Sequence, residues 1–384
     1  MKRFGVVFLI FCLMAFLPAY AESAQELSLV ALSAGKADAL ILTMDGRHVL
    51  IDAGYARSMG KLRAAFEQLQ ITELDAVILT HTDGDHADGL DWLAGSDIPV
   101  GEWYASAMYT GVKTKKHPAV RAAAQRNQSV IWLQRGDSLR FGSAEIAVLA
   151  PETPNSNNEN DNSLVLMVSH PDGRILLTGD MEFGEEGILL ASGDDLRCDV
   201  LKIPNHADDD TCSDALLRAA SPSLAIISTD SEEKPETPDG RILAGLAQIG
   251  AEVVQTQECS GWIEIRLEGG SPSYTRTDLP NIDAALRVID VLPGDDTITL
   301  RNDGAAQALS GWYLYSSKGG ELFLFPQDAM IGAGETLTVG TLSSPEGSFD
   351  LLWNDKKVIH TSKTDSIALY APNGLLISQM RNGF

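Results

Sequence analysis

Positive charge is scarce in this sequence of 384 residues, in which 29 Lys and Arg stand against 53 Asp and Glu and the formal net charge is −24 at pH 7. A field of this sign repels polyanions, which argues against tight nonspecific binding of nucleic acid through a basic surface. Any phosphate substrate would therefore need bound metal cations to offset the negative charge.

A hydrophobic run long enough to span a membrane is also lacking. The longest one, Phe4–Leu17, follows a Lys-Arg pair and is shorter than the roughly 20 residues that a membrane-spanning helix needs. Ala19 and Ala21 supply the small residues of a cleavage site. The sequence predicts a signal peptide over residues 1–21, no stable transmembrane anchor, and a secreted, periplasmic or cell-envelope protein; an uncleaved anchor is the alternative.

Cysteine is rare as well, and only Cys198, Cys212 and Cys259 remain after the predicted cleavage. An exported protein permits one disulfide and leaves one odd thiol. The preferred pair is Cys212 with Cys259, because both flank the predicted end of the same sheet. The alternative is a set of three buried thiols.

The remaining composition is that of an ordinary globular protein, with 44% hydrophobic and 21% charged residues, and the length suits two domains. Short β-type runs are expected at 27–32, 39–44, 47–51, 76–79, 100–104, 130–133, 144–149, 164–169, 175–178, 200–203 and 224–228, and helices at 57–69, 118–126, 183–191, 213–219 and 240–248. This alternation predicts an α/β domain over residues 22–267, an αβ/βα sandwich in which helices cover sheets.

The C-terminal quarter has a different pattern. Residues 268–282 are rich in Gly, Ser, Pro and Thr, which is typical of a linker. Residues 283–384 contain short β-type runs separated by turn sequences such as Pro-Asn-Gly, with almost no helical period. The sequence therefore predicts a second, all-β domain built as a small sandwich.

A dense group of potential metal ligands follows the apolar run at 76–79. His81, Asp83, Asp85 and His86 lie within six residues, and imidazole with carboxylate suits Zn²⁺, Mn²⁺ or iron. The spacing places His81 and Asp83 near one metal and Asp85 and His86 near a second. The alternative, a solvated acidic turn, requires that two His and two Asp gathered there by accident.

More distant residues must complete such a site. Asp180 closes the segment Leu176-Leu177-Thr178-Gly179-Asp180, just after an apolar strand, and it is predicted to bridge the metals. His206 lies at the end of another strand and is predicted to be a ligand. Asn160 or Asp161 could add a weak ligand. The predictions for the remaining candidates are a charged loop at 208–210, surface positions for His117 and His170, and structural roles for His48 and His360.

These residues resemble the metallo-β-lactamase superfamily, and more narrowly its branch that includes the soluble hydrolase domain of the competence protein ComEC. The resemblance rests on segments in the same order, namely Gly35-Lys36-Ala37-Asp38-Ala39, Leu50-Ile51-Asp52-Ala53-Gly54, the loop from His81 to Gly89, Asn162-Ser163-Leu164-Val165-Leu166, Leu177-Thr178-Gly179-Asp180 and Asp199-Val200-Leu201-Lys202. It implies a two-metal hydrolase that acts as a nuclease or phosphodiesterase. By that likeness the metal ligands are His81, Asp83, Asp85, His86, Asp180 and His206, and Asp85 also orients the attacking water.

The sequence departs from the branch at three places. The usual His-His-Gly-Ser motif is replaced by Asn205-His206-Ala207-Asp208. A Gly-His-Pro is replaced by Thr237-Pro238-Asp239, and a Gln-Gly pair by Lys36-Ala37. Fewer imidazoles and more oxygens favour Mn²⁺ or a weakly held second metal. The cofactor prediction is two divalent metal ions, Zn or Mn, with the second site the weaker one.

The C-terminal segment resembles a lamin-tail domain, an immunoglobulin-like β-sandwich. The matching residues run in order from Ile298 to Tyr370, and they place Trp312 and Trp353 in the core rather than on a binding platform. Such a domain is expected to contact a component of the cell envelope.

The resulting hypothesis is an exported metal-dependent hydrolase, a phosphodiesterase or nuclease acting on extracellular nucleic acid or a nucleotide-like substrate. One alternative is hydrolysis of a lactam, lactone or thioester, since the same metal pair polarises carbonyl groups. Another is an envelope binding protein with a degenerate metal site, because the sequence has fewer imidazoles than the branch it resembles.

Overall fold

The computed structural model describes residues 26–109 and 112–383, so the signal peptide predicted over residues 1–21 lies outside the described residues. Within those ranges, no helix is both long enough and apolar enough to cross a membrane.

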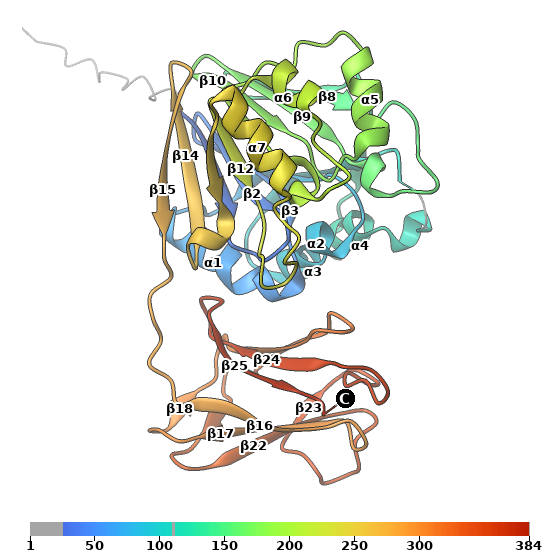
Figure 1. Cartoon of the computed structure of the whole chain (residues 1–384). Coiled ribbons are helices and arrows are strands. Elements are labelled where there is room, and N and C mark those ends of the chain that lie inside the picture. Colours follow the sequence, from blue (N-terminus) through green and yellow to red (C-terminus); the bar gives the residue numbers. More distant parts are fainter. Residues whose placement is uncertain (1–25, 110–111, 384) are drawn as a thin grey trace, which may run out of the picture.

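The first part of the chain contains two sheets that face each other (Figure 1). The first sheet has the order β15-β14-β1-β2-β3-β4-β5-β6, and its strands are β1 (Leu27–Leu32), β2 (Ala39–Met44), β3 (Arg47–Ala53), β4 (Leu74–Leu79), β5 (Val100–Ser106), β6 (Val130–Leu133), β14 (Trp262–Glu268) and β15 (Ser271–Thr277). The second sheet has the order β13-β12-β11-β10-β9-β8-β7, and its strands are β7 (Ser138–Phe141), β8 (Ala144–Ala150), β9 (Val165–His170), β10 (Gly173–Leu177), β11 (Val200–Lys202), β12 (Leu224–Ile227) and β13 (Glu252–Gln255).

Helices cover the outer face of each sheet. The first sheet carries α1 (Met59–Gln68), α2 (Gly84–Ala87), α3 (Gly89–Gly95) and α4 (Pro118–Gln125), and the second carries α5 (Phe183–Ala191), α6 (Asp214–Ala220) and α7 (Gly240–Ile249). Short 3-10 turns connect them as η1 (Ala56–Ser58), η2 (Thr114–Lys116), η3 (Asn160–Asn162), η4 (Pro204–Ala207) and η5 (Thr256–Glu258). The predicted αβ/βα sandwich is confirmed.

Burial on both faces explains why the central strands are continuously apolar. Every residue of β1 is buried, because Leu29 and Ala31 face the core between the sheets while Val30 and Leu32 face the helices. Strand β8, which lies next to the edge strand β7, instead alternates buried and half-buried residues with a period of two. The hydrophobic pattern therefore fixes which strands lie at the centre.

The predicted linker at 268–282 is partly wrong. Ser271–Thr277 form β15, which pairs antiparallel with β14 along its whole length. This strand alternates half-buried and exposed residues at the edge of the sheet, so it needs little apolar sequence. Its Ser, Pro and Thr content therefore resembles a linker although the segment is hydrogen-bonded.

The predicted disulfide between Cys212 and Cys259 is also wrong. Cys198, Cys212 and Cys259 are buried free thiols, as the alternative prediction had it. Cys259 belongs to the core between the two sheets, whereas Cys198 and Cys212 belong to the core between the second sheet and its helices. A sheet therefore separates the proposed partners.

The C-terminal part consists of strands with its own hydrophobic core, in which Trp312 and Trp353 are buried as predicted. Its sheets have the orders β16-β17-β22-β23, β20-β19-β24-β25 and β18-β21. The strands are β16 (Leu286–Leu292), β17 (Thr297–Asn302), β18 (Gln307–Ala308), β19 (Tyr313–Ser316), β20 (Leu322–Leu324), β21 (Met330–Ile331), β22 (Thr336–Thr341), β23 (Leu351–Trp353), β24 (Ser366–Tyr370) and β25 (Leu376–Arg381).

The C-terminal strands dock against the end of the first part that carries α1 and η1 (Figure 1). The Tyr313 hydroxyl donates a hydrogen bond to the carbonyl oxygen of Arg57 at 2.7 Å. Gly60 and Gly374 bring the two backbones together, since a Cβ added at Gly60 would lie 2.5 Å from the Gly374 nitrogen. No other residue type fits this contact without displacing one of the two backbones.

Candidate metal centre

The predicted ligands converge because they follow strands of both sheets at the same end of the sandwich. His81 follows β4, Asp85 and His86 lie in α2, Asp180 follows β10, and His206 lies in η4 after β11. Since β3 and β4 run parallel in one sheet and β10 and β11 run parallel in the other, these ligands leave the carboxyl ends of the strands. This is the usual position of sites in α/β proteins.

A close backbone contact fixes the ligand loop against the first sheet. A Cβ added at Gly89 would lie 2.1 Å from the carbonyl oxygen of Ala53, at the end of β3. The Gly89 amide also donates a hydrogen bond to the carbonyl oxygen of Gly54 at 2.9 Å. Glycine at this position therefore lets the α2–α3 segment approach β3 closely.

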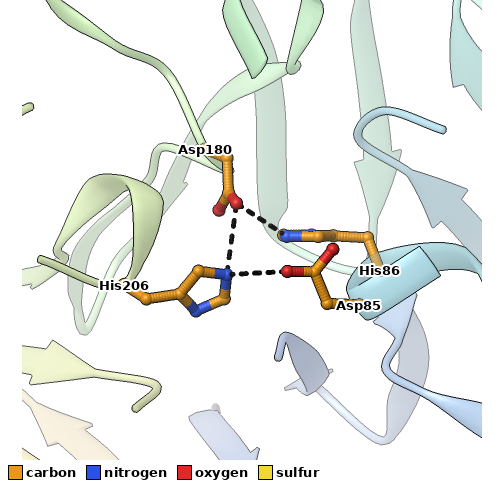
Figure 2. Close-up of side chains that lie close together, drawn as sticks. All are labelled: Asp85, His86, Asp180 and His206. Carbon is orange, nitrogen blue, oxygen red and sulfur yellow. Dashed lines mark ion pairs between the residues drawn. The ribbon is translucent and has the colours of Figure 1, made fainter. Parts of the chain in front are cut away.

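Asp85, His86, Asp180 and His206 form one group whose ligand atoms all lie within 4.8 Å of one another (Figure 2). The Oδ2 atom of Asp180 lies 3.2 Å from His86 Nε2 and 3.1 Å from His206 Nε2. His206 Nε2 lies 3.6 Å from Asp85 Oδ2. One oxygen of Asp180 therefore contacts both imidazoles, and the bridging of two metals by Asp180 stays a prediction.

His81 and Asp83 lie beside this group rather than in it. Their Nε2 and Oδ2 atoms are 3.8 Å apart, and the rings of His81 and His86 have centroids 4.2 Å apart. The side chain of Asp83 is 49% exposed, while that of His81 is fully buried. Asp83 therefore lies toward solvent, whereas His81 is buried beside His86.

Each of the three histidines is oriented by a contact at Nδ1. His86 Nδ1 lies 2.7 Å from Asp52 Oδ2, and His206 Nδ1 lies 2.7 Å from the carbonyl oxygen of Ser228. His81 Nδ1 lies 3.2 Å from the Thr80 hydroxyl, which itself donates to Asp52 Oδ2 at 2.7 Å. A carbonyl oxygen only accepts, so the His206 ring carries its hydrogen at Nδ1 and directs the Nε2 lone pair into the group.

The buried polar atoms that face the centre fit a divalent cation. Among the described residues, the Nε2 atoms of His81, His86 and His206 and the Oδ1 atom of Asp180 are buried without a hydrogen-bond partner. Buried polar atoms in folded proteins are otherwise almost always paired. A donor set of two or three imidazole nitrogens together with carboxylate oxygens suits Zn²⁺ or Mn²⁺.

Charge within the centre also favours a cation. Burial disfavours the charged form of His86, yet the carboxylates of Asp180 and Asp52 raise its pKa well above the usual value. Burial likewise opposes the charge of Asp180, but His206 and His86 hold the pKa of that carboxyl well below its usual range. A proton held at His86 Nε2 would have to leave before that atom binds a cation, so the apparent metal affinity is expected to rise with pH.

The backbone at His206 is held in a rare conformation. Asn205, His206 and Ala207 have φ values of 41°, 53° and 63°, in the left-handed region that non-glycine residues seldom adopt. Each such residue costs about 1–3 kcal/mol and persists where the surroundings dictate it. The Asn205 amide is fixed by a hydrogen bond to the carbonyl oxygen of Gly179 at 3.2 Å, which turns His206 toward the neighbouring Asp180.

Asp38, Asp52 and Lys202 lie in the motifs that resemble the superfamily, but the sequence predicted no role for them. Lys202 is fully buried, and its Nζ lies 2.5 Å from Asp38 Oδ2 and 3.8 Å from Asp180 Oδ1. Burial would lower the pKa of Lys202, but Asp38 and Asp180 raise it, so the ammonium stays charged. A charged residue directly at the end of an apolar run could have indicated such a role, as Asp52 does after Val49-Leu50-Ile51.

Several other expectations are wrong. Asn160 and Asp161 do not enter the ligand group, because Asn160 donates to Glu182 and Asp161 accepts from the backbone of Glu182 and Glu185. His117 and His170 are not surface residues, since they are 1% and 8% exposed. Aromatic rings of Tyr109 and Trp132 cover His117, and Asp45 contacts His170.

The acidic loop at 208–210 and His48 lie outside the four-residue group. The acidic loop at 208–210 is a second group of neighbouring carboxylates, but Asp208 is already paired with Lys234. His48 contacts the Thr43 hydroxyl at 3.1 Å within its own hairpin.

An Asp52→Asn variant is expected to bind Zn²⁺ or Mn²⁺ about 10- to 100-fold more weakly, because partners that orient a metal-binding histidine have effects of this size. The amide still accepts at one oxygen, so the loss reflects the charge and orientation given to His86 and Thr80. Titration with a competing chelator measures the change. Asp75→Asn, which alters a carboxylate that contacts Arg47 and the His48 backbone, is the matched control and should leave affinity unchanged.

The chain is similar to several known proteins. ComE operon protein 3 of Bacillus subtilis (strain 168) is 28% identical over 202 residues, which cover 51% of this chain and 25% of that protein. Competence protein ComA of Neisseria gonorrhoeae is 25% identical over 256 residues, which cover 66% of this chain and 34% of that protein. The chain therefore spans about a quarter to a third of the length of these relatives.

Among solved structures, the metallo-beta-lactamase fold protein YhfI from Bacillus subtilis is 12% identical, with a TM-score of 0.40 over 59% of this chain and 95% of that chain. The model of the metallo-beta-lactamase superfamily matches residues 33–231, a range that begins before Asp38 and extends past His206. With that match over half of its length, the chain belongs to the metallo-beta-lactamase superfamily.

Proposed function

We propose that the protein is an exported metal-dependent hydrolase of phosphodiesters, with nucleic acid or a nucleotide-like molecule as its substrate. The observation that carries this proposal is the buried group of Asp85, His86, Asp180 and His206, whose imidazole Nε2 atoms lack hydrogen-bond partners among the described residues. The superfamily fold supports hydrolysis. The names of two relatives, competence protein ComA of Neisseria gonorrhoeae and recombination protein 2 of Haemophilus influenzae, support a nucleic-acid substrate.

The residues of the group would hold one divalent cation, Zn or Mn, and His81 with Asp83 would hold a second that shares Asp180. Bound cations of this kind polarise a phosphoryl group and lower the pKa of water. Asp85 has the most exposed side chain of the four at 17%, so its carboxylate is placed to accept a hydrogen bond from the attacking water and to orient it. Asp52, Thr80 and the Ser228 carbonyl keep the three imidazoles in position during the reaction.

The test uses the mature chain, residues 22–384, stripped with a chelator and reloaded with Zn²⁺ or Mn²⁺. Elemental analysis gives the metal content, and the substrates are plasmid DNA, RNA and bis-p-nitrophenyl phosphate, with nitrocefin and a lactone in parallel. We expect phosphodiester cleavage that falls by about 10²-fold in Asp85→Asn, the lower end of the effect of a positioned proton acceptor.

Three results would contradict the proposal, and each has its own meaning. Equal activity of the parent and Asp85→Asn removes the role of that carboxylate. Turnover of nitrocefin or the lactone alone indicates an acyl hydrolase. Absence of bound metal after loading indicates a binding protein with a degenerate centre.

The C-terminal strands are proposed to form a lamin-tail-like β-sandwich that attaches the hydrolase to a cell-envelope component after export. The separate hydrophobic core of residues 286–371 and the buried Trp312 and Trp353 support a compact β unit. Fractionation of cells that express the full chain, compared with a chain ending at residue 282, tests the attachment. Equal distribution of both between envelope and medium would contradict it.

A further inference from the structure

Lys36 places a positive charge at the edge of the metal centre. Its Nζ lies 3.9 Å from Asp85 Oδ2, the carboxylate oxygen that also lies 3.6 Å from His206 Nε2. The side chain is only 17% exposed, so the ammonium is held against the centre rather than spread into solvent. Lys36 is thus a positive charge at the edge of a group rich in carboxylates, in a chain with a net charge of −24.

The loop that carries Lys36 is fixed from two sides. The Asp38 amide donates to the carbonyl oxygen of Asp85 at 3.1 Å, and the Lys36 amide donates to Glu233 Oε2 at 3.2 Å. Gly35 has a φ of +91°, and a Cβ there would lie 2.5 Å from the Arg57 guanidinium and 2.8 Å from Glu233. The loop therefore holds the Lys36 backbone at a defined distance from Asp85.

The carboxylates around Lys36 have other partners. Asp208 is paired with Lys234, which lowers its pKa against the effect of burial, and Lys36 adds to that lowering. Asp85 belongs to the four-ligand group, so a cation bound there neutralises the charge that faces Lys36. In the metal-loaded protein the ammonium would then lack a full counter-charge and would favour an incoming anion.

We propose that Lys36 is a substrate-binding residue that pairs with an anionic oxygen of the phosphoryl group, and that it selects phosphate esters over neutral esters and lactones. This inference rests on the proposed function, whose substrate class it makes specific. A phosphoryl oxygen beside Lys36 would thus meet a cation that can donate a charge-assisted hydrogen bond.

The test measures binding of inorganic phosphate by calorimetry to the metal-loaded mature protein, with the metal content of every sample determined in parallel. The variants are Lys36→Gln, which keeps the polarity and removes the charge, and Lys36→Arg, which keeps the charge. Lys116→Gln, an exposed lysine in η2, is the matched control. We expect about a tenfold weaker binding in Lys36→Gln, the effect of losing one charge-assisted hydrogen bond, and near-parental binding in the other two.

Kinetics give an independent readout. Lys36→Gln should raise KM for bis-p-nitrophenyl phosphate while kcat/KM for p-nitrophenyl acetate, a neutral ester, stays at the parental value. The inference would be overturned if Lys36→Gln kept its metal and bound phosphate as tightly as the parent. It would also be overturned if Lys36→Gln lost its metal, because Lys36 would then be needed for the metal centre itself. If the parent binds phosphate through Lys36 but cleaves no phosphodiester, the inference stands and the proposed function fails.

Discussion

An Asp180→Asn variant is expected to lose stoichiometric binding of Zn²⁺ or Mn²⁺ and to hydrolyse phosphodiesters about a thousandfold more slowly, since a catalytic cation contributes several kcal/mol of charge stabilisation and each 1.4 kcal/mol is a factor of ten. Asp180 Oδ2 lies within 3.2 Å of both His86 Nε2 and His206 Nε2, so this one oxygen contacts both imidazoles. An amide of the same shape lacks the charge that a cation requires. Elemental analysis and the phosphodiester assay measure both effects.

Asp209→Asn is the matched control for this prediction. Asp209 is an exposed carboxylate in the acidic loop that follows His206, so its replacement removes the same charge without touching the four-ligand group. We expect parental metal content and activity. Retention of both by Asp180→Asn, with a circular dichroism spectrum like that of the parent, would show that the centre lies elsewhere.

A Lys202→Met variant is expected to lose about 3–5 kcal/mol of folding free energy, because removing one partner of a buried ion pair leaves the other charge uncompensated. The partner is Asp38, which is 1% exposed and whose Oδ2 lies 2.5 Å from Lys202 Nζ. Burial alone would raise the pKa of Asp38, and Lys202 is the first of the charges that hold it below its usual value. Urea denaturation of metal-free protein measures the loss without a contribution from bound cations.

The double variant Asp38→Asn/Lys202→Met separates the pair from simple loss of packing. With both charges removed, we expect the free energy of unfolding to recover a large part of the deficit, because no buried charge is left unpaired. Lys115→Met, at an exposed position in η2, controls for the introduced methionine and should leave stability unchanged. Additive losses in the double variant would mean that the 2.5 Å contact is not an energetic pair.

Much of the sandwich could be predicted because its strands are buried on both faces and read as apolar runs with definite ends. The convergence of the candidate ligands at the ends of those runs could be predicted for the same reason. His81, Asp180 and His206 each come just after a strand, and parallel strands deliver the chain to one edge of the sheet. Spacing along the loop was enough to place Asp85 and His86 together.

Contacts between distant segments left no comparable local signal. Asp52 precedes His86 by 34 residues, yet their side chains lie 2.7 Å apart. Lys202 and Asp38 come from strands and loops of different sheets. His117 is polar in sequence but buried by two aromatic rings, and β15 has the composition of a linker but is fixed by pairing with β14. Tertiary surroundings decided each of these cases against local composition.

The contact between Gly60 and Gly374 limits the substitutions that each of the two positions tolerates. A side chain at either position would collide with the backbone of the other, so the tolerance of each glycine is set by a residue at the opposite end of the chain. A C-terminal β unit that docks in this way therefore requires a glycine at the contact position of α1. The two glycines therefore constrain each other as a matched pair in this fold.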